Sequence, residues 1–458
     1  MALTALSIWA QQPPAQLPVI QRRYLTNLAD EDWSFLSDPK LRHDPWDPLK
    51  FIPFPREGWY LTLGGEARLS PQGLRVRGDE VIPSALDNYF LQRYLLAADF
   101  HLGPRFRVFT ELQSGILNGR IRSPRPSDQD LLELHQGFFQ FTTLTRHKRK
   151  FSLRLGRQEL NIGSGRLISP SQGLNVKRSF DGLSAIYAAQ DWAFEGGIAR
   201  LVRIRPGIFD DPPDSEQDFW GLSFTRRLLP WKNSQFNFYY LGINRKYSIF
   251  AQGIGPERRH TFGSRLSGRA SRLDYNYDLI VQFGSFRDAP VRAWAVSTDT
   301  GFSFKLFGVP LRAGVNLNSA SGDRDPNDPS LQSFNPLFPG SSYSGIVGLL
   351  GPTNLSDITP SLRANVRRNL LIAFESPSYF RTSLNDGVYT IDQRLVFRGI
   401  GNPHRYVGSN PGVIVSYQPF AHITFTGAIT RFQSGQLLSD TFARNGFGFY
   451  SIAGTYRF

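Results

Sequence analysis

The chain ends in Tyr450-Ser-Ile452-Ala-Gly454-Thr-Tyr456-Arg-Phe458, a period-2 series of mostly apolar side chains that starts at the terminal aromatic residue. Successive side chains of a β-strand point to opposite faces, so this series presents one apolar face, as a strand in contact with lipid must. Lipid cannot satisfy backbone N–H and C=O groups, so such a strand needs paired neighbours on both sides. The stretch therefore predicts the closing strand of a transmembrane β-barrel.

The composition agrees with a barrel and excludes a helical membrane protein. Hydrophobic residues make up 40% of the 458 residues, and after the N-terminus no apolar run approaches the length of about 18 residues that a spanning helix needs. A barrel hides its hydrophobicity in alternation, so a polar average is expected. The chain has no cysteine, which excludes thiol catalysis and cysteine metal sites.

The N-terminus predicts targeting to the cell envelope. Residues 1–10 are apolar and end in a small residue before Gln11-Gln12-Pro13-Pro14, as a truncated signal peptide would. A disordered soluble N-terminus is the alternative. We expect residues 11–58 to form a periplasmic N-terminal segment and residues 59–458 to form the barrel.

From Trp59 onward the sequence divides into amphipathic stretches of roughly ten to fourteen residues, the length that a tilted strand needs to cross a bilayer. Short links such as Gly103-Pro104 alternate with long polar links such as 161–177 and 246–258, as periplasmic turns alternate with external loops. The expected strands are 59–70, 89–102, 105–117, 131–144, 149–160, 178–190, 192–204, 217–228, 234–245, 259–269, 272–286, 291–307, 309–320, 358–367, 369–377, 405–418, 420–432 and 446–458. The predicted fold is all-β: a single-chain antiparallel transmembrane barrel of 18 strands, with long extracellular loops at about 321–357 and 378–404.

Alternation also predicts which side chains face the lumen. In the expected strand 272–286, Leu273 and Phe283 share the lipid face, so Asp278 faces inward. A charge facing lipid at the midplane costs about 2–4 kcal/mol, so charges are expected on the luminal parity. The pore-lining candidates are Arg68, Arg93, Arg107, Arg154, Arg265, Arg312 and Arg363, with the interleaved acids Glu66, Asp99, Glu111 and Asp274 expected to hold them in place. For any single residue, the alternative is an ion pair within the wall that takes no part in transport.

The charge balance favours an anionic partner. The chain has 52 Lys and Arg against 38 Asp and Glu, a net charge of +14 at pH 7. Nucleic acid and lipopolysaccharide phosphates are competing anions. Basic residues on the luminal parity favour an anionic solute that passes through the barrel.

Three blocks carry a family resemblance. The first is Asp47-Pro48-Leu49-Lys50-Phe51-Ile52-Pro53-Phe54, followed by Leu63-Gly64-Gly65-Glu66-Ala67-Arg68. The second is Leu155-Gly156-Arg157-Gln158-Glu159-Leu160-Asn161-Ile162-Gly163-Ser164-Gly165-Arg166-Leu167, with Arg178-Ser179-Phe180-Asp181-Gly182. The third is 406–408, 422–425, 433–435 and 449–458. Together they resemble the alginate export family of outer-membrane channels, over nearly the whole chain.

The resemblance implies an eighteen-stranded monomeric barrel in which an arginine-lined constriction lets a negatively charged polysaccharide leave the cell. It also implies narrowing by a long extracellular loop and by a periplasmic element. The charged residues of the family motif that are present here are Arg157, Glu159 and Arg166. By strict alternation Arg157 shares the face of Leu153 and Leu155, unless Gly156 marks a bulge.

The expected function is export of an alginate-like polyuronate through an anion-selective pore in the outer membrane of a Gram-negative cell. Guanidinium groups bind carboxylates through two-pronged hydrogen bonds, and several weak contacts would ease passage without trapping the polymer. The partners expected besides the polysaccharide are outer-membrane lipid and lipopolysaccharide, the barrel assembly machinery and periplasmic export proteins. Nucleic acid is not expected as a partner.

The alternatives are a general or small-solute porin, which the same barrel would serve, an outer-membrane enzyme, and a structural or adhesin barrel that is plugged shut. Seven histidines scattered singly and no Gly-x-Ser-x-Gly elbow argue against catalysis, so neither enzyme activity nor a cofactor is predicted. Asp323-x-Asp325-x-Asn327 has the opening spacing of a calcium loop but lacks its glycine and closing glutamate. A solvated polar loop is the expectation there, and no metal site is predicted.

Overall fold

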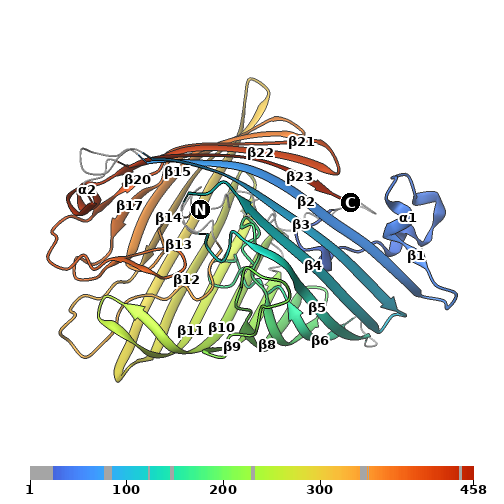
Figure 1. Cartoon of the computed structure of the whole chain (residues 1–458), viewed down its shortest axis with the longest axis horizontal. Helices are drawn as coiled ribbons and strands as arrows, with labels where there is room; N and C mark the ends of the chain where they lie inside the picture. Colours follow the sequence, from blue (N-terminus) through green and yellow to red (C-terminus); the bar gives the residue numbers. More distant parts are fainter. Residues whose placement is uncertain are drawn as a thin grey trace.

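The chain forms one antiparallel sheet that closes on itself (Figure 1). The computed structural model describes residues 24–76, 85–121, 124–144, 149–227, 233–340, 348, 350–442 and 446–458. The signal peptide expected at 1–10 lies outside these residues. In Figure 1 the blue β2 (Trp59–Val76) runs beside the red β23 (Phe447–Arg457), and their pairing closes the barrel. The predicted all-β barrel is confirmed.

The wall has eighteen positions: fourteen continuous strands from β2 to β15, two interrupted strands, and then β22 and β23. The first half continues with β3 (Ala85–Leu102), β4 (Phe106–Asn118), β5 (Asp130–Leu144), β6 (Lys150–Gln158), β7 (Phe180–Ala188), β8 (Trp192–Leu201), β9 (Gln217–Arg227) and β10 (Ser234–Phe250). The second half contains β11 (Gly253–Ala270), β12 (Leu273–Phe286), β13 (Ala289–Leu306), β14 (Val309–Ala320), β15 (Leu355–Arg367), β16 (Leu370–Glu375) with β17 (Ser378–Arg381), β20 (Tyr406–Ser409) with β21 (Gly412–Phe420), and β22 (Ile423–Ser434).

The predicted strands all correspond to wall strands, but three long links differ from expectation. The link expected between 70 and 89 is shorter, because β2 extends to Val76 and β3 begins at Ala85. The polar stretch 246–258 is mostly strand, because β10 and β11 pair as far as Phe250 and Gly253 around a bulge. The expected loop 378–404 begins with β17, which continues the wall by pairing with β15. The rest of that loop contains a small ribbon of β18 (Val388–Tyr389) and β19 (Leu395–Phe397).

Alternation holds around the wall. Large apolar side chains on one parity are exposed to the membrane, as with Phe139 at 67% and Leu222 at 64% exposure. On the other parity, side chains such as Glu66 and Arg93 are buried, because chain segments fill the lumen. Among the described residues, no helix is both long enough and apolar enough to cross a bilayer.

A short N-terminal segment, residues 24–50, lies at the periplasmic mouth. It consists of three 3₁₀ turns, Leu28–Asp30, Ser34–Ser37 and Pro39–Leu41, followed by helix α1 (Asp47–Lys50). Leu28 and Ala29 pack against the inward side chains of Leu95, Phe109 and Phe138. Residues 24–50, part of the expected segment 11–58, therefore fold against the inside of the wall. The two-residue strand β1 (Ile52–Pro53) then pairs with β2. A second helix, α2 (Gln436–Phe442), connects β22 to β23.

Candidate functional site

The lumen is crossed by the chain between β6 and β7, residues 159–179, which we call the luminal loop. On one side, Arg93 Nη1 of β3 donates to the carbonyl oxygens of Gln172 at 2.9 Å and Leu174 at 2.6 Å. On the other side, Arg166 Nη1 of the loop contacts Asp278 Oδ2 of β12 at 2.6 Å. In the ring of strands β3 and β12 lie opposite each other, so the loop spans the barrel.

A buried ionic cluster joins the two ends of the luminal loop to each other and to the wall. Lys177 Nζ lies 2.6 Å from Glu159 Oε1 and 3.2 Å from Glu111 Oε1 on β4. His135 Nε2 on β5 lies 3.0 Å from the same Glu159 oxygen. The Lys177 side chain is fully buried, so its ammonium group depends on these two carboxylates for compensation. Lys177 thus occupies the position that a metal ion would need between the two acids.

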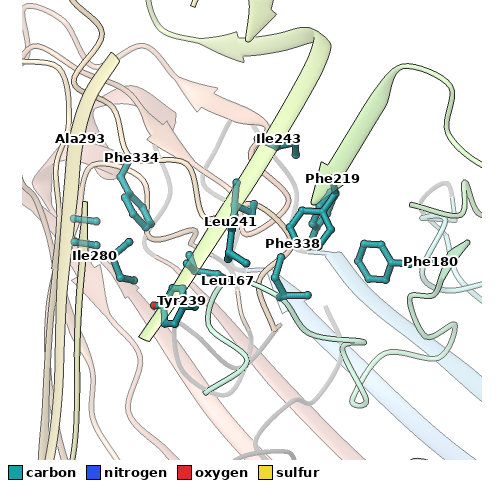
Figure 2. Packing of buried hydrophobic residues seen from close by; sticks show 14 residues of the cluster. Leu167, Phe180, Phe219, Tyr239, Leu241, Ile243, Ile280, Ala293, Phe334 and Phe338 are labelled. Atoms are coloured by element: carbon teal, nitrogen blue, oxygen red, sulfur yellow. The ribbon is translucent and has the colours of Figure 1, made fainter. Parts of the chain in front are cut away.

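An apolar cluster fixes the middle of the luminal loop (Figure 2). Leu167 of the loop and Phe338 of the chain after β14 pack against inward side chains of the wall, among them Leu241 on β10 and Phe219 on β9. We call residues 321–340 the second loop. The backbones of the two loops are also paired, because Phe338 N donates to Leu167 O at 2.8 Å. The two loops therefore form one inserted unit.

The periplasmic mouth is narrowed by residues 24–50. Arg107 Nη2 donates to Ala29 O at 2.7 Å. Lys50 Nζ, which is fully buried, contacts Glu31 Oε2 at 3.3 Å and Phe458 O at 2.8 Å. Burial lowers the pKa of Lys50, and Glu31 opposes that shift. The segment is therefore fastened both to the wall at β4 and to the end of the chain.

The predicted pore-lining residues divide into two groups by their partners. Three arginines lie beside acids: Arg93–Glu66 at 2.6 Å, Arg107–Asp99 at 2.7 Å and Arg312–Asp274 at 2.6 Å. Glu111 pairs with Lys177 instead of an arginine. Arg363 on β15 lies opposite Arg312 in the register. These side chains all lie on the luminal parity.

The second group has neutral partners. Arg68 donates to Gly173 O at 3.1 Å, Arg154 to Gln140 Oε1 at 2.9 Å and Arg265 to Asn276 Oδ1 at 2.7 Å. Among the described residues, no carboxylate lies within 4.0 Å of these three guanidinium groups. Their positive charge is therefore less compensated than that of the paired arginines. They lie on β2, β6 and β11, on different sides of the lumen.

The family-motif residues have separate positions. Glu159 belongs to the buried cluster, and Arg166 reaches β12. Arg157 contacts Asp181 Oδ1 on β7 at 2.8 Å and Glu133 Oε1 on β5 at 3.1 Å. The pairing of β6 stays in register at Arg157, although Gly156 has a φ of 131°. No bulge therefore turns Arg157 toward the luminal parity.

Sequence reasoning missed Lys177 and His135 as members of the site. Lys177 lies in a polar loop, where a lysine is usually solvated, and the position of His135 depends on a register shift between β4 and β5. The available signal was the position of Lys177 directly before the expected strand 178–190, where a side chain can reach the inside of the wall.

Comparisons with known proteins agree with this geometry. The family model for alginate export matches residues 60–446. No curated protein sequence gives a significant match. Among solved structures, Pseudomonas aeruginosa OpdK with vanillate has a TM-score of 0.58 at 11% identity, covering 86% of this chain and 98% of that one. A BenF-like porin from Pseudomonas fluorescens Pf-5 has a TM-score of 0.56 at 12% identity, covering 87% and 98%. At such identities the likeness shows the fold, which is that of an outer-membrane porin.

Proposed function

We propose that this chain, which belongs to the alginate export family, exports an anionic polysaccharide of the polyuronate kind through an arginine-lined passage. The family and the barrel make it a channel of the Gram-negative outer membrane. Its family and its structural neighbours are channels and porins rather than enzymes. The finer proposal is supported by one observation: Arg68, Arg154 and Arg265 present guanidinium groups to the luminal parity without a carboxylate partner.

The physical argument is electrostatic. Each sugar of a polyuronate carries a carboxylate, and a guanidinium group binds a carboxylate through two parallel hydrogen bonds. Arginines already paired with acids would bind a polymer carboxylate more weakly, because it would compete with the existing carboxylate. Uncompensated arginines on separate strands would instead bind successive carboxylates of the polymer weakly, so that the polymer moves from one arginine to the next.

The test is a planar-bilayer recording on the full chain refolded in detergent. We expect a reversal potential in a salt gradient that indicates anion selectivity, and a current that oligouronates block. Replacing both Arg154 and Arg265 by glutamine should weaken that block by roughly tenfold or more, since a charged hydrogen bond contributes about 1.5–3 kcal/mol.

The matched control is Arg200→Gln, because Arg200 lies on the exposed outer parity paired with Asp218 at 2.7 Å. This variant should keep the wild-type block. A cation-selective pore, or equal block in the double variant and the wild type, would refute the proposal.

A small-solute porin is the second candidate, because the luminal loop crosses the barrel and narrows the passage. OpdK, whose fold this chain shares, was solved with vanillate, a small carboxylate. Permeation of small carboxylates without any block by longer oligouronates would favour this candidate. We further propose that the protein is a monomer and that it receives the polymer from periplasmic export proteins. The mass of the detergent-solubilised particle tests the oligomeric state.

A further inference from the structure

A gap in the wall at the extracellular rim is filled by the chain between β8 and β9. β6 ends at Gln158, whereas its neighbour β5 extends to Asp130, which leaves the upper edge of β5 without a wall partner. Residues 202–216, which we call the rim loop, cover this edge. Leu131 N donates to Gly207 O at 3.1 Å, and Phe209 N donates to Leu132 O at 2.9 Å.

Three carboxylates meet where the rim loop contacts β5, and a fourth lies close enough for their charges to act on it. Asp130 and Glu133 come from β5, and Asp210 and Asp211 come from the rim loop. Glu133, Asp210 and Asp211 each have a carboxylate oxygen within 4.8 Å of the others. Glu133 also accepts from Arg157 Nη1 at 3.1 Å and from Asp211 N at 3.1 Å, and Asp211 Oδ1 accepts from Arg205 N at 2.5 Å.

Asp130 indicates that this cluster is more than a solvated acidic surface. The residue is 1% exposed, and neither of its carboxylate oxygens has a hydrogen-bond partner. Asp210 Oδ1 is likewise buried without a partner. Burying a carboxylate oxygen without a hydrogen bond or a cation is unfavourable. Burial and the neighbouring Glu133 carboxylate also raise the pKa of Asp211 to about 6, against the effect of the Arg205 N–H. The one guanidinium in contact with these carboxylates in the described part of the chain, Arg157, also pairs with Asp181, so the cluster keeps more negative than positive charge.

We propose that a calcium ion binds between Asp130, Glu133, Asp210 and Asp211 and fastens the rim loop to β5. Calcium takes six to eight oxygen ligands, with carboxylates binding through one or both oxygens. The unpartnered oxygens of Asp130 and Asp210 supply ligands from both sides of the contact, and water completes the shell. The site lies on the side of the long loops, where the external medium supplies the ion. It is separate from the Asp323-x-Asp325-x-Asn327 stretch.

The test uses the full chain refolded from inclusion bodies into detergent, so that no lipopolysaccharide contributes calcium. Isothermal titration with calcium chloride should show binding that Asp130→Asn and Asp210→Asn each weaken at least tenfold. The unpartnered oxygens of Asp130 and Asp210 accept no hydrogen bond in the structure, so a loss of calcium binding in these variants would reflect the loss of a ligand. Asp218→Asn is the matched control, since Asp218 is an exposed rim acid paired with Arg200, and it should bind calcium as the wild type does.

Hydrogen exchange supplies an independent readout. Calcium should slow exchange at least tenfold in peptides covering 203–216, and chelation should reverse the effect, in the wild type and the control but not in the two variants. Calcium binding that is unchanged in Asp130→Asn and Asp210→Asn would overturn the proposal. The proposal would also be overturned if calcium did not change the rate of hydrogen exchange in the rim loop.

Discussion

Replacing Lys177 by methionine should loosen the luminal loop and open the pore. Methionine keeps most of the length of the side chain but removes the ammonium group that lies between Glu111 and Glu159. Both carboxylates are buried, so they would face each other across the vacated position, with His135 and Gln172 still in contact with Glu159. The substitution therefore acts on the attachment of the loop, while the hydrogen-bonded wall stays unchanged.

The magnitude follows from the burial of the cluster. Removing one partner of a buried ion pair costs about 3–5 kcal/mol, because the remaining charge is left without compensation. Solvent screening does not reduce this value, since Lys177 and Glu111 are fully buried. The equilibrium between attached and detached loop should therefore shift by about two to four orders of magnitude toward the detached form. Protonation of one of the two facing carboxylates would recover part of this loss at low pH.

Single-channel recording measures the effect directly. Lys177→Met should show a larger conductance and more current noise than the wild type, and the increase should be smaller at pH 5 than at pH 8. Lys150→Met is the matched control, because Lys150 is exposed at the start of β6. Its conductance should equal that of the wild type.

The reasoning would be refuted if Lys177→Met conducted like the wild type while still folding into a heat-modifiable barrel. Unchanged hydrogen exchange in peptides covering 159–179 would lead to the same conclusion.

Three further predictions concern the inserted loops and the wall. Arg166→Gln removes the ion pair to Asp278 and should raise the conductance less than Lys177→Met does, because Ser164 still donates to Asp278. Single-channel recording measures this, and an unchanged conductance would contradict the prediction. Burial and the Asp386 carboxylate raise the pKa of Asp323 to about 7, so the contact between the second loop and residues 382–405 should be strongest below the unfolded pKa of about 4 and weaken as pH rises through 7. Hydrogen exchange at pH 5.5 and 8, corrected for intrinsic rates, measures this, and Asp323→Asn should abolish the difference. Gly156→Ala should reduce the yield of folded barrel measured by electrophoretic mobility, because a φ of 131° is strained for any residue other than glycine and a Cβ would lie 2.2 Å from Gly137 O. The control is Gly427→Ala, which should fold normally because a Cβ there would have no atom within 4 Å.

The wall was predictable because its rules are local. The alternation that puts Leu279 outward and Asp278 inward can be counted along one strand, and a turn such as Gly103-Pro104 is recognised from two residues. The number of strands follows from adding such local units. The hairpin of β10 and β11 extended past its expected end because polar residues can pair above the membrane as well as within it.

The inserted loops could not be predicted in the same way. The contact between Arg166 and Asp278 joins residues 112 positions apart, and no period in the sequence relates them. The alternation locates Arg93 and Arg68 on the luminal parity, but whether each meets an acid or a carbonyl depends on where the luminal loop lies. Their roles in transport remain predictions.

The luminal loop is joined to the wall at both ends, by β6 and by β7. If a polymer is exported as proposed and displaces the loop, both attachments hold the displaced segment at about millimolar effective concentration beside its binding position. Return is then an intramolecular motion of the kind that loops complete within nanoseconds to microseconds. Under the proposed function, a loop attached in this way would close the passage again after each exported chain has left.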